Sequence, residues 1–240
     1  MEDSVWTPVA VRLFAFTVLP ALLATLHVRR DTSAKGRLRT VEVYLIYLFV
    51  LGVAAGGISG FFGHVFTPDM VADSIDWPKG SPFQQEMGFA NLALGVLGLI
   101  AAGRRDGFRE ATVIAVAIVG VGATFVHVID MVQEGNLAPG NSIQNIGNLL
   151  KPALLIPILI VSRRSESNEV DDPSFDPWRR SVLGTAGIVT AVVGTGFGIG
   201  FSLELAVPST LIAAVLAAGI VARSASTRRT AEVLSRHPLS

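Results

Sequence analysis

Eight polar side chains between residues 64 and 151 have the types and spacing that could bind a ligand or carry out chemistry. Half of the chain is hydrophobic and only 16% is charged, so such side chains must be placed among apolar neighbours at a cost. Histidine and aspartate can exchange protons, lysine can pair with an acid, and carboxamides donate and accept hydrogen bonds. The candidates are His64, Glu86, Asn91, His127, Asp130, Gln144, Asn148 and Lys151.

His127 and Asp130 are the most suggestive pair, because a spacing of three residues places them close together on a helix. His127 could act as an acid or base oriented by Asp130. The two could instead ligate a metal together with His64 and Glu86, or the two histidines could be axial ligands of a haem. The chain has no HExxH or ExxH pattern and no cysteine. We therefore expect no metal site and no disulfide, and the sequence leaves any cofactor unknown.

Long apolar runs must position these side chains. A run of about 20 apolar residues can cross the hydrocarbon core as a helix, and runs that are continuous rather than alternating argue against strands. The sequence therefore predicts an all-α, polytopic integral membrane bundle of about seven transmembrane helices. The predicted helices cover residues 8–27, 41–66, 85–103, 111–133, 142–161, 181–203 and 208–221.

The polar segments between these helices divide the chain. Residues 1–161 form a five-helix membrane core, 162–180 a cytoplasmic linker, 181–222 a C-terminal transmembrane hairpin, and 223–240 a basic cytoplasmic tail. The segment from 67 to 85 is predicted to be an ordered loop with an interfacial Trp77, and Pro20 predicts a bend. Helices rich in glycine and alanine can approach one another closely, which predicts a homo-oligomer.

The distribution of basic residues predicts the orientation. Of the 19 lysines and arginines, 16 fall in segments on the same side of the predicted helices. Because cytoplasmic loops carry the excess of basic residues, the N-terminus is expected outside and the C-terminus inside. This pattern predicts a multi-pass protein of the plasma (inner) membrane with the lipid bilayer as its partner and no nucleic-acid partner.

This orientation places all eight candidates in the extracytoplasmic half of the membrane. Gln144, Asn148 and Lys151 form one helical stripe, and Lys151 is about 13 Å from the preceding loop at 1.5 Å per residue. A charge at such depth costs at least about 2.5 kcal/mol. We therefore expect Lys151 to pair with Glu86 or Asp130. Glu42 belongs to the opposite end, where it should pair with Arg39 or another basic group.

Three functional classes and one structural alternative follow from these residues. The first is a binding or accessory membrane protein that holds a small polar or lipid-like ligand in an outer-side pocket. The second is a transporter of a small solute, which needs a polar path to the cytoplasm. The third is a membrane enzyme that uses the pair His127 and Asp130. The structural alternative is a hydrogen-bond network that fixes helix register, so the sequence leaves enzymatic activity open.

Several motifs resemble those of a family of multi-pass bacterial membrane proteins that is known only as a domain of unknown function. They are Gly63-His64 at a helix end, SPFQQEMGFANL from residue 81, His127 in the next helix, and GNLAPGN from residue 135. The resemblance covers residues 40–160 and implies the fold without an activity.

A more distant similarity links the third and fourth helices to DoxX-like membrane proteins. The shared features are a third helix that begins with a glutamate and a basic turn before the fourth helix. Some DoxX-like proteins are associated with quinone-linked or thiol redox systems, so this similarity implies a quinone-linked redox role. The additional helices and the absence of cysteine depart from that pattern.

Overall fold

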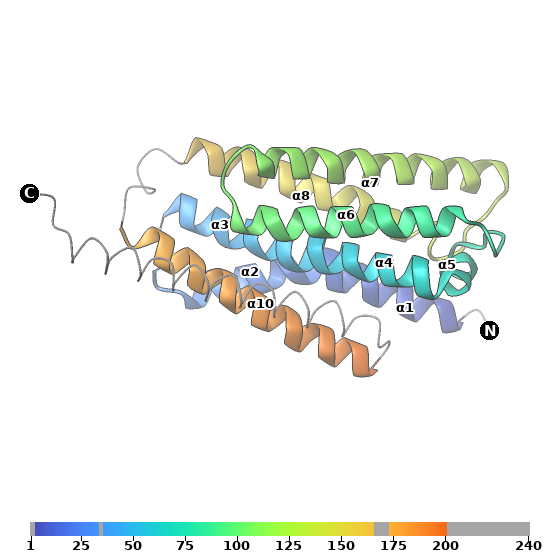
Figure 1. Cartoon of the computed structure of the whole chain (residues 1–240), viewed down its shortest axis with the longest axis horizontal. Helices are drawn as coiled ribbons and strands as arrows, with labels where there is room; N and C mark the ends of the chain where they lie inside the picture. Colours follow the sequence, from blue (N-terminus) through green and yellow to red (C-terminus); the bar gives the residue numbers. More distant parts are fainter. Residues whose placement is uncertain (1–2, 34–35, 166–172, 201–240) are drawn as a thin grey trace, which may run out of the picture.

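The computed structural model describes residues 3–33, 36–165 and 173–200, and every regular element in these ranges is a helix. The helices lie along one another in an elongated bundle (Figure 1). We call the two ends of the bundle the α5 end, which carries α5, the N-terminus and the 134–143 loop, and the arginine end, which carries the 104–107 turn. The predicted all-α fold class is confirmed for the described residues.

Two of the long helices each contain a π-helical segment. The first consists of α1 (Asp3–Leu13), η1 (Phe14–Val18) and α2 (Leu19–Arg30). The second consists of α3 (Arg37–Tyr47), η2 (Leu48–Ala55) and α4 (Gly56–Phe66). The remaining helices are α5 (Pro68–Ile75), α6 (Phe83–Gly103), α7 (Phe108–Gln133), α8 (Gln144–Arg164) and α10 (Phe175–Gly200).

Five helical segments of the described chain are long and apolar enough to cross a membrane. They are Thr7–Arg30, Arg37–Phe66, Phe83–Gly103, Phe108–Gln133 and Gln144–Arg164. These segments correspond to the first five predicted helices and indicate a membrane protein. The count of seven is not confirmed, because α10, the counterpart of the predicted sixth helix, is not among these segments and the predicted helix at 208–221 lies outside the described residues.

The predicted sixth helix begins earlier than expected. It corresponds to α10, which starts at Phe175, inside the segment predicted to be a linker. Phe175 and Trp178 are buried, and Trp178 Nε1 donates a hydrogen bond to Asp31 Oδ2 at 2.7 Å. The aromatic side chains of this polar stretch thus have a packing surface, which allows α10 to begin there and to lie against α3 and η2.

Pro20 of the first helix is preceded by a π-helical turn. Pro20 has no backbone N–H and removes one helical hydrogen bond, and η1 ends two residues before it. An added Cβ at Gly52 of η2 would lie 3.2 Å from the Phe16 carbonyl oxygen of η1, so the two π-helical segments are in close contact. Such segments are frequent at functional sites, and here they border a cavity.

The helix that runs from α3 to α4 forms the centre of the bundle. In its most apolar stretch 78% of the residues are buried, whereas in that of α7 only 17% are buried. The exposed side of α7 is itself apolar and includes Ile118, Val121 and Phe125. A helix that exposes large apolar side chains in this way is suited to contact lipid.

Two helix pairs approach closely at glycines. An added Cβ at Gly57 of α4 would lie 2.6 Å from the Asn91 carbonyl oxygen of α6. Gly120 of α7 lies similarly against the Asn148 carbonyl oxygen of α8. Small residues allow this approach of helix backbones, so α4 with α6 and α7 with α8 form two tightly packed pairs.

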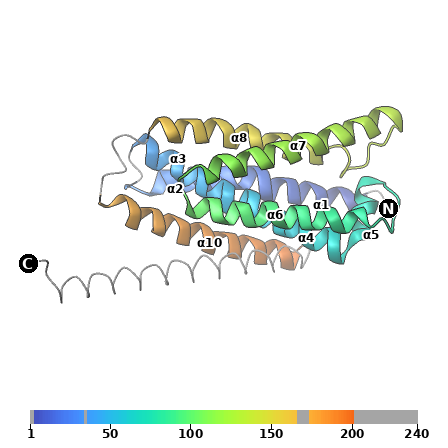
Figure 2. The ribbon, with the colours of Figure 1, turned by 45° about the horizontal axis from the view of Figure 1, so that its top comes forward.

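The two pairs separate toward the α5 end. Figure 2 shows α6 and α7 close together at the 104–107 turn and diverging toward the opposite end of the bundle. α6 packs against α4, and α7 packs against α8. Side chains therefore line the space between α6 and α7, and the two backbones do not close it. The cavity described below occupies this region.

The predicted loop at 67–85 contains the short helix α5. Pro68 suits the first turn of a helix, and α5 buries Ala72 and Ile75 on one face. The helix ends at Asp76, whose φ of 53° is left-handed, and the Trp77 N–H donates to the Ala72 carbonyl at 3.0 Å. This C-terminal cap fixes the direction in which the chain places Trp77.

Candidate functional site

A cavity of about 970 Å³ lies at the α5 end among the first helix and helices α4 to α8. Its inner boundary is formed by Phe16, Thr17, Gly52 and Val53 of the two π-helical segments. It extends from there toward α5 and the 134–143 loop, so it opens toward one end of the bundle.

Six of the eight candidate residues line this cavity, and two do not. The lining residues are His64, Asn91, His127, Gln144, Asn148 and Lys151. Glu86 and Asp130 are not part of the lining. The cavity is also lined by Arg12 and Gln84, which the sequence-based candidate set omitted.

Lys151 lies deep in α8, on the face that it shares with Gln144 and Asn148. The helical stripe formed by these three residues is as predicted, since all three line the cavity. The expected ion pair between Lys151 and Glu86 or Asp130 does not form. Among the described side chains, none makes an ion pair or a hydrogen bond with the Lys151 ammonium.

Glu86 points away from the cavity because of its position on α6. It is exposed, whereas Gln84 and Gly88 are buried. At 100° per residue, Glu86 lies 200° from Gln84 around the helix. Gln84 shares a face with Gly88 and Asn91, at spacings of four and seven residues. That spacing was available in the sequence and could have identified Gln84.

Gln84 orients His64. The His64 Nδ1 donates to Gln84 Oε1 at 2.5 Å, which joins the end of α4 to the start of α6. The Nε2 atom of His64 has no hydrogen bond to a described side chain. A histidine held through one ring nitrogen presents the other in a defined direction, and His64 therefore has a fixed ring beside the cavity.

His127 and Asp130 are joined through Asn141 rather than directly. Asp130 Oδ2 accepts hydrogen bonds from Trp77 Nε1 at 2.9 Å, Asn136 Nδ2 at 2.7 Å and Asn141 Nδ2 at 2.9 Å. Asn141 Oδ1 lies 2.6 Å from His127 Nδ1. Because Asn141 Nδ2 is already a donor, its oxygen accepts and His127 Nδ1 carries the proton. Asp130 thus does not contact the imidazole that it was expected to orient.

This group of hydrogen bonds anchors the 134–143 loop. Asn136 Nδ2 also donates to the Ile75 carbonyl of α5 at 2.8 Å, and Asn141 is fully buried. The Trp77 ring lies over His127, with 5.3 Å between ring centroids. The GNLAPGN motif therefore connects α5, α7 and α8, and Asp130 is satisfied by protein donors.

We expect Asn141→Ala to lower the free energy of unfolding by about 1–3 kcal/mol, because it leaves buried partners without hydrogen bonds. Ser142→Ala is the matched control, since Ser142 Oγ donates only to carbonyls of its own turn, Leu137 and Ala138. Thermal unfolding of the purified variants in detergent measures the difference. Equal melting temperatures for the two variants would contradict the anchoring role of Asn141.

A surface ion pair lies beside the opening of the cavity. Lys79 Nζ lies 2.7 Å from Asp73 Oδ1, and both side chains are about half exposed. The hydrogen bond to Asp73 raises the pKa of the Lys79 ammonium. Asp73 of α5 is the acidic residue in the cavity lining, and Lys79, which follows α5 in the chain, compensates its charge.

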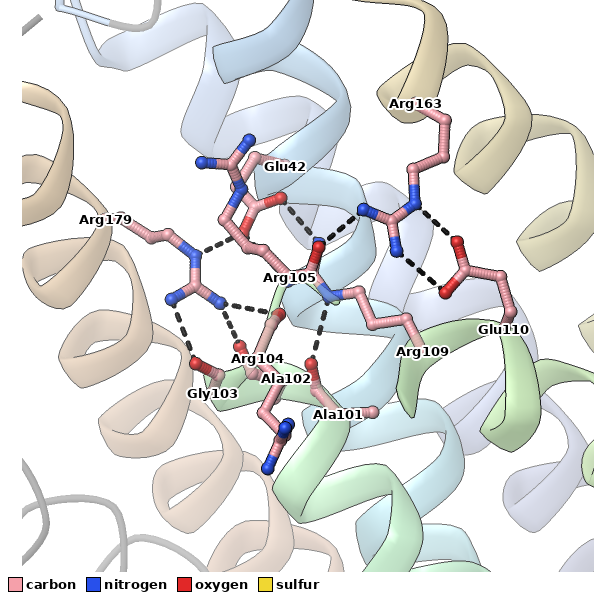
Figure 3. Close-up of polar contacts among 10 residues, drawn as sticks. All are labelled: Glu42, Ala101, Ala102, Gly103, Arg104, Arg105, Arg109, Glu110, Arg163 and Arg179. Carbon is pink, nitrogen blue, oxygen red and sulfur yellow. Dashed lines mark hydrogen bonds and ion pairs between the residues drawn. The ribbon is translucent and has the colours of Figure 1, made fainter. Parts of the chain in front are cut away.

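A second charged cluster lies at the arginine end. Glu42 of α3 is fully buried and accepts hydrogen bonds from Arg109 Nη1 at 2.7 Å and Nη2 at 2.8 Å (Figure 3). Its Oε1 also accepts from Arg179 Nε of α10. The prediction that Glu42 pairs with a basic group at this end is confirmed, with Arg109 and Arg179 as its partners.

The same arginines cap the end of α6. Arg109 Nε donates to the Ala101 carbonyl at 3.0 Å, and Arg179 Nη2 donates to the Ala102 carbonyl at 2.5 Å. The final carbonyls of a helix have no partner within it and carry partial negative charge. The buried cluster has two arginines and only one glutamate. The carbonyls at the end of α6 therefore compensate part of its excess positive charge.

Arg163 of α8 extends this cluster. It forms an ion pair with Glu110 of α7 and donates through Nη1 to the Arg105 carbonyl at 2.5 Å. Figure 3 shows side chains of α7 and α10 reaching carbonyls at the end of α6, and Arg163 of α8 reaching the turn that follows α6. The arginine end is thus closed by contacts among five helices, whereas the α5 end contains the cavity.

No group of three or more histidine, aspartate and glutamate side chains that could hold a metal ion occurs within the described part of the chain. His64 and His127 line the same cavity, but each is held by a carboxamide. The set considered as an alternative metal site, these histidines with Glu86 and Asp130, is not brought together, because Glu86 is exposed and Asp130 is hydrogen-bonded to Trp77, Asn136 and Asn141.

The fold and the site define a class of protein: a helical bundle of apolar, membrane-length helices with a cavity at one end that has apolar walls and several polar side chains. Residues 10–168, which are more than half of the chain, match the model of a family of unknown function, DUF6790. The chain belongs to this family, which confirms the resemblance to a family of unknown function. Neither the curated proteins nor the solved structures provide a significant match. The similarity to DoxX-like proteins has no support in these comparisons.

Proposed function

We propose that this protein is a multi-pass protein of the plasma (inner) membrane that binds a small polar or lipid-like ligand from the extracytoplasmic side. The cavity at the α5 end is the observation on which this proposal depends. It combines apolar walls with the polar groups of Lys151, His64 and Gln144. Concave sites of 300–1,000 Å³ with a few convergent polar groups are typical of small-molecule binding.

The orientation and the domain plan belong to this proposal. The excess of basic residues supports a cytoplasmic arginine end, so the α5 end and its cavity face outward. In this plan residues 1–161 are the ligand-binding core, 162–180 link it to a transmembrane hairpin at 181–222, and 223–240 form a cytoplasmic tail. Seven transmembrane helices and a homo-oligomer through glycine- and alanine-rich faces complete the plan.

Single cysteines test this orientation without background, because the chain contains no native cysteine. Leu137→Cys lies in the loop at the α5 end and is exposed. Gly107→Cys lies in the turn at the arginine end, where an added Cβ meets nothing within 4 Å. In intact cells, a membrane-impermeant maleimide should label the first variant and spare the second. The reverse pattern would contradict the proposed orientation.

Binding is favoured over transport and catalysis by the shape of the site. Transport needs a path through both halves of the membrane, whereas the cavity extends only to the π-helical segments and the arginine cluster occupies the other end. An acid–base mechanism with His127 and Asp130 needs direct contact between them, but Asn141 lies between. No feature of the described residues supports the quinone-linked redox role.

Filling the cavity tests whether it binds a ligand. Val119 and Val121 lie two residues apart on α7, and only Val119 lines the cavity. Val119→Trp should displace any bound molecule, whereas Val121→Trp places the same side chain on the exposed face, where Val121 is 54% exposed. Mass spectrometry of molecules that co-purify with each variant provides the readout.

We expect a small molecule to co-purify at near-stoichiometric amounts with the wild type and Val121→Trp, and to be lost from Val119→Trp. The two variants have the same added bulk and the same helix, so a difference between them reports on the cavity. Identical co-purified molecules in all three proteins would contradict binding in this cavity.

A further inference from the structure

We infer that the ligand is an amphiphile with an anionic head group, a carboxylate or a phosphate, whose head lies at Lys151 and whose apolar tail extends between α6 and α7. This inference depends on the proposed function, since it names the ligand class of the same cavity. It follows from the charge of the lining and from the nature of the cavity wall.

Lys151 carries the main part of the charge argument. Lys151 lies seven residues into α8 from Gln144, which is about 10 Å along the helix axis. A cation at this depth in a membrane helix needs a counter-charge or a water-filled path. No described side chain supplies the counter-charge to Lys151, and its side chain borders a cavity large enough to admit one.

The other charged groups of the lining make it more positive. The Arg12 guanidinium lines the same cavity, and its Nη1 lies 3.6 Å from the position of a Cβ at Gly63. Arg12 has contacts of its own, so it adds to the positive potential without being the group in need of a partner. The acidic residue of the lining, Asp73, is paired with Lys79 at the rim. An anion is therefore the complementary ligand.

Neutral donors surround the position of the head group. Gln144 and Asn148 are on the same face of α8 as Lys151, and their carboxamides can donate to an oxyanion. The Asn148 Nδ2 has one long contact of 3.4 Å to Asn145 Oδ1, and Gln144 has no side-chain hydrogen bond to the described residues. A carboxylate or phosphate accepts several hydrogen bonds at once, which suits this group of donors.

The wall between α6 and α7 is apolar and partly open. Phe83 and Met87 line it on α6, and Val119 and Val126 line it on α7. These two valines are 37% and 48% exposed although they border the cavity. An added Cβ at Gly122 would meet nothing within 4 Å. The wall thus contacts both the cavity and the surface facing lipid, which provides a route for an acyl tail.

Trp77 provides a reporter for this site, because it lines the cavity and lies over His127. The probes are 9,10-dibromostearate, the dibromostearoyl monoglyceride and inorganic phosphate, added to the purified protein in a neutral maltoside detergent. The brominated chain quenches tryptophan fluorescence on contact. The two amphiphiles share a tail and differ in head-group charge, and phosphate has the charge without the tail. Trp77→Phe identifies the part of the quenching that arises at the cavity.

We expect saturable quenching of Trp77 by dibromostearate at a concentration about tenfold lower than for the monoglyceride, a factor equal to about 1.4 kcal/mol. Lys151→Met should abolish this discrimination and leave the weaker binding of the monoglyceride unchanged, whereas Lys151→Arg should preserve it. Inorganic phosphate at millimolar concentration should not displace dibromostearate. The comparison of probes on the wild type does not depend on the folding of any variant.

The other possible outcomes would contradict the anionic head group, the amphiphile or the cavity itself. Equal binding of both amphiphiles would overturn the anionic head group and leave the proposed cavity function in place. Displacement of dibromostearate by phosphate alone would identify a site for free anions and overturn the amphiphile. Quenching that is the same in wild type and Val119→Phe, which adds bulk at the cavity wall without a further tryptophan, would show that the cavity takes up neither amphiphile, which contradicts the proposed function itself.

Discussion

Replacement of Glu42 by glutamine is expected to lower the free energy of unfolding by about 3–5 kcal/mol, the cost of removing one partner from a buried ion pair. The Glu42 side chain is fully buried, and Arg109 and Arg179 are 1% and 7% exposed. Without the carboxylate, two guanidinium groups would be buried close together with only the carbonyls at the end of α6 to compensate them. Their mutual repulsion adds to the loss of hydrogen bonds.

The matched control is Glu110→Gln, at the same end of the bundle. Glu110 pairs with Arg163, but their side chains are 38% and 30% exposed. Ion pairs that are open to solvent contribute about 0–1 kcal/mol. Thermal unfolding in detergent should therefore show a large loss for Glu42→Gln and a small one for Glu110→Gln. Losses of similar size would contradict the account of the arginine end as a buried, compensated cluster.

Gly57→Ala is also expected to destabilise the protein, because it adds a methyl group between two helix backbones. Its Cβ would lie 2.6 Å from the Asn91 carbonyl oxygen and 2.7 Å from the Gly95 nitrogen. These are backbone atoms that cannot rotate away, so α4 and α6 must separate. Overpacking of this kind costs about 1–3 kcal/mol, and separation of these helices also alters the α4 and α6 walls of the cavity.

Gly122→Ala on α7 is the control for the same substitution. An added Cβ there meets nothing within 4 Å, and alanine is favoured over glycine in a helix by about 1 kcal/mol. We expect this variant to be as stable as the wild type or more stable. Melting temperatures that decrease equally for Gly57→Ala and Gly122→Ala would contradict the close packing of α4 against α6.

The sequence was sufficient to predict features that depend on local periodicity. Apolar runs identified the five helices that are long enough to cross a membrane, and the spacing of Gln144, Asn148 and Lys151 identified their common face on α8. The same periodicity applied from Asn91 back to Gln84 would have excluded Glu86 in favour of Gln84. The choice of Glu86 reflected its charge rather than its position on the helix.

The sequence did not determine which polar groups meet across the bundle. Arg109 and Arg179 lie outside the predicted helices, in segments whose basic residues indicated only the cytoplasmic side. Their contacts with Glu42 span 67 and 137 residues of the chain. Asn141 similarly separates His127 from Asp130, and only the path of the 134–143 loop places it there. Such contacts depend on tertiary packing, which a spacing of three or four residues cannot encode.

The two ends of the bundle thus use polar residues differently. At the arginine end, Glu42 and the carbonyls of α6 compensate buried guanidinium groups, and the end is closed. At the α5 end, Lys151 borders a cavity and has no partner among the described side chains. A half-buried cation without a partner, beside open space, is the feature that distinguishes a binding site from a structural network, in which each charge is satisfied within the protein.

An experimental density map of the protein, purified from its own membrane and reconstituted in lipid nanodiscs, tests the central claim most directly. We predict density for a bound molecule in the cavity at the α5 end, with its polar part within hydrogen-bonding distance of Lys151 Nζ and an elongated part between α6 and α7. A map in which Lys151 forms an ion pair with an acidic side chain, and side chains fill the space between α6 and α7, would contradict the claim.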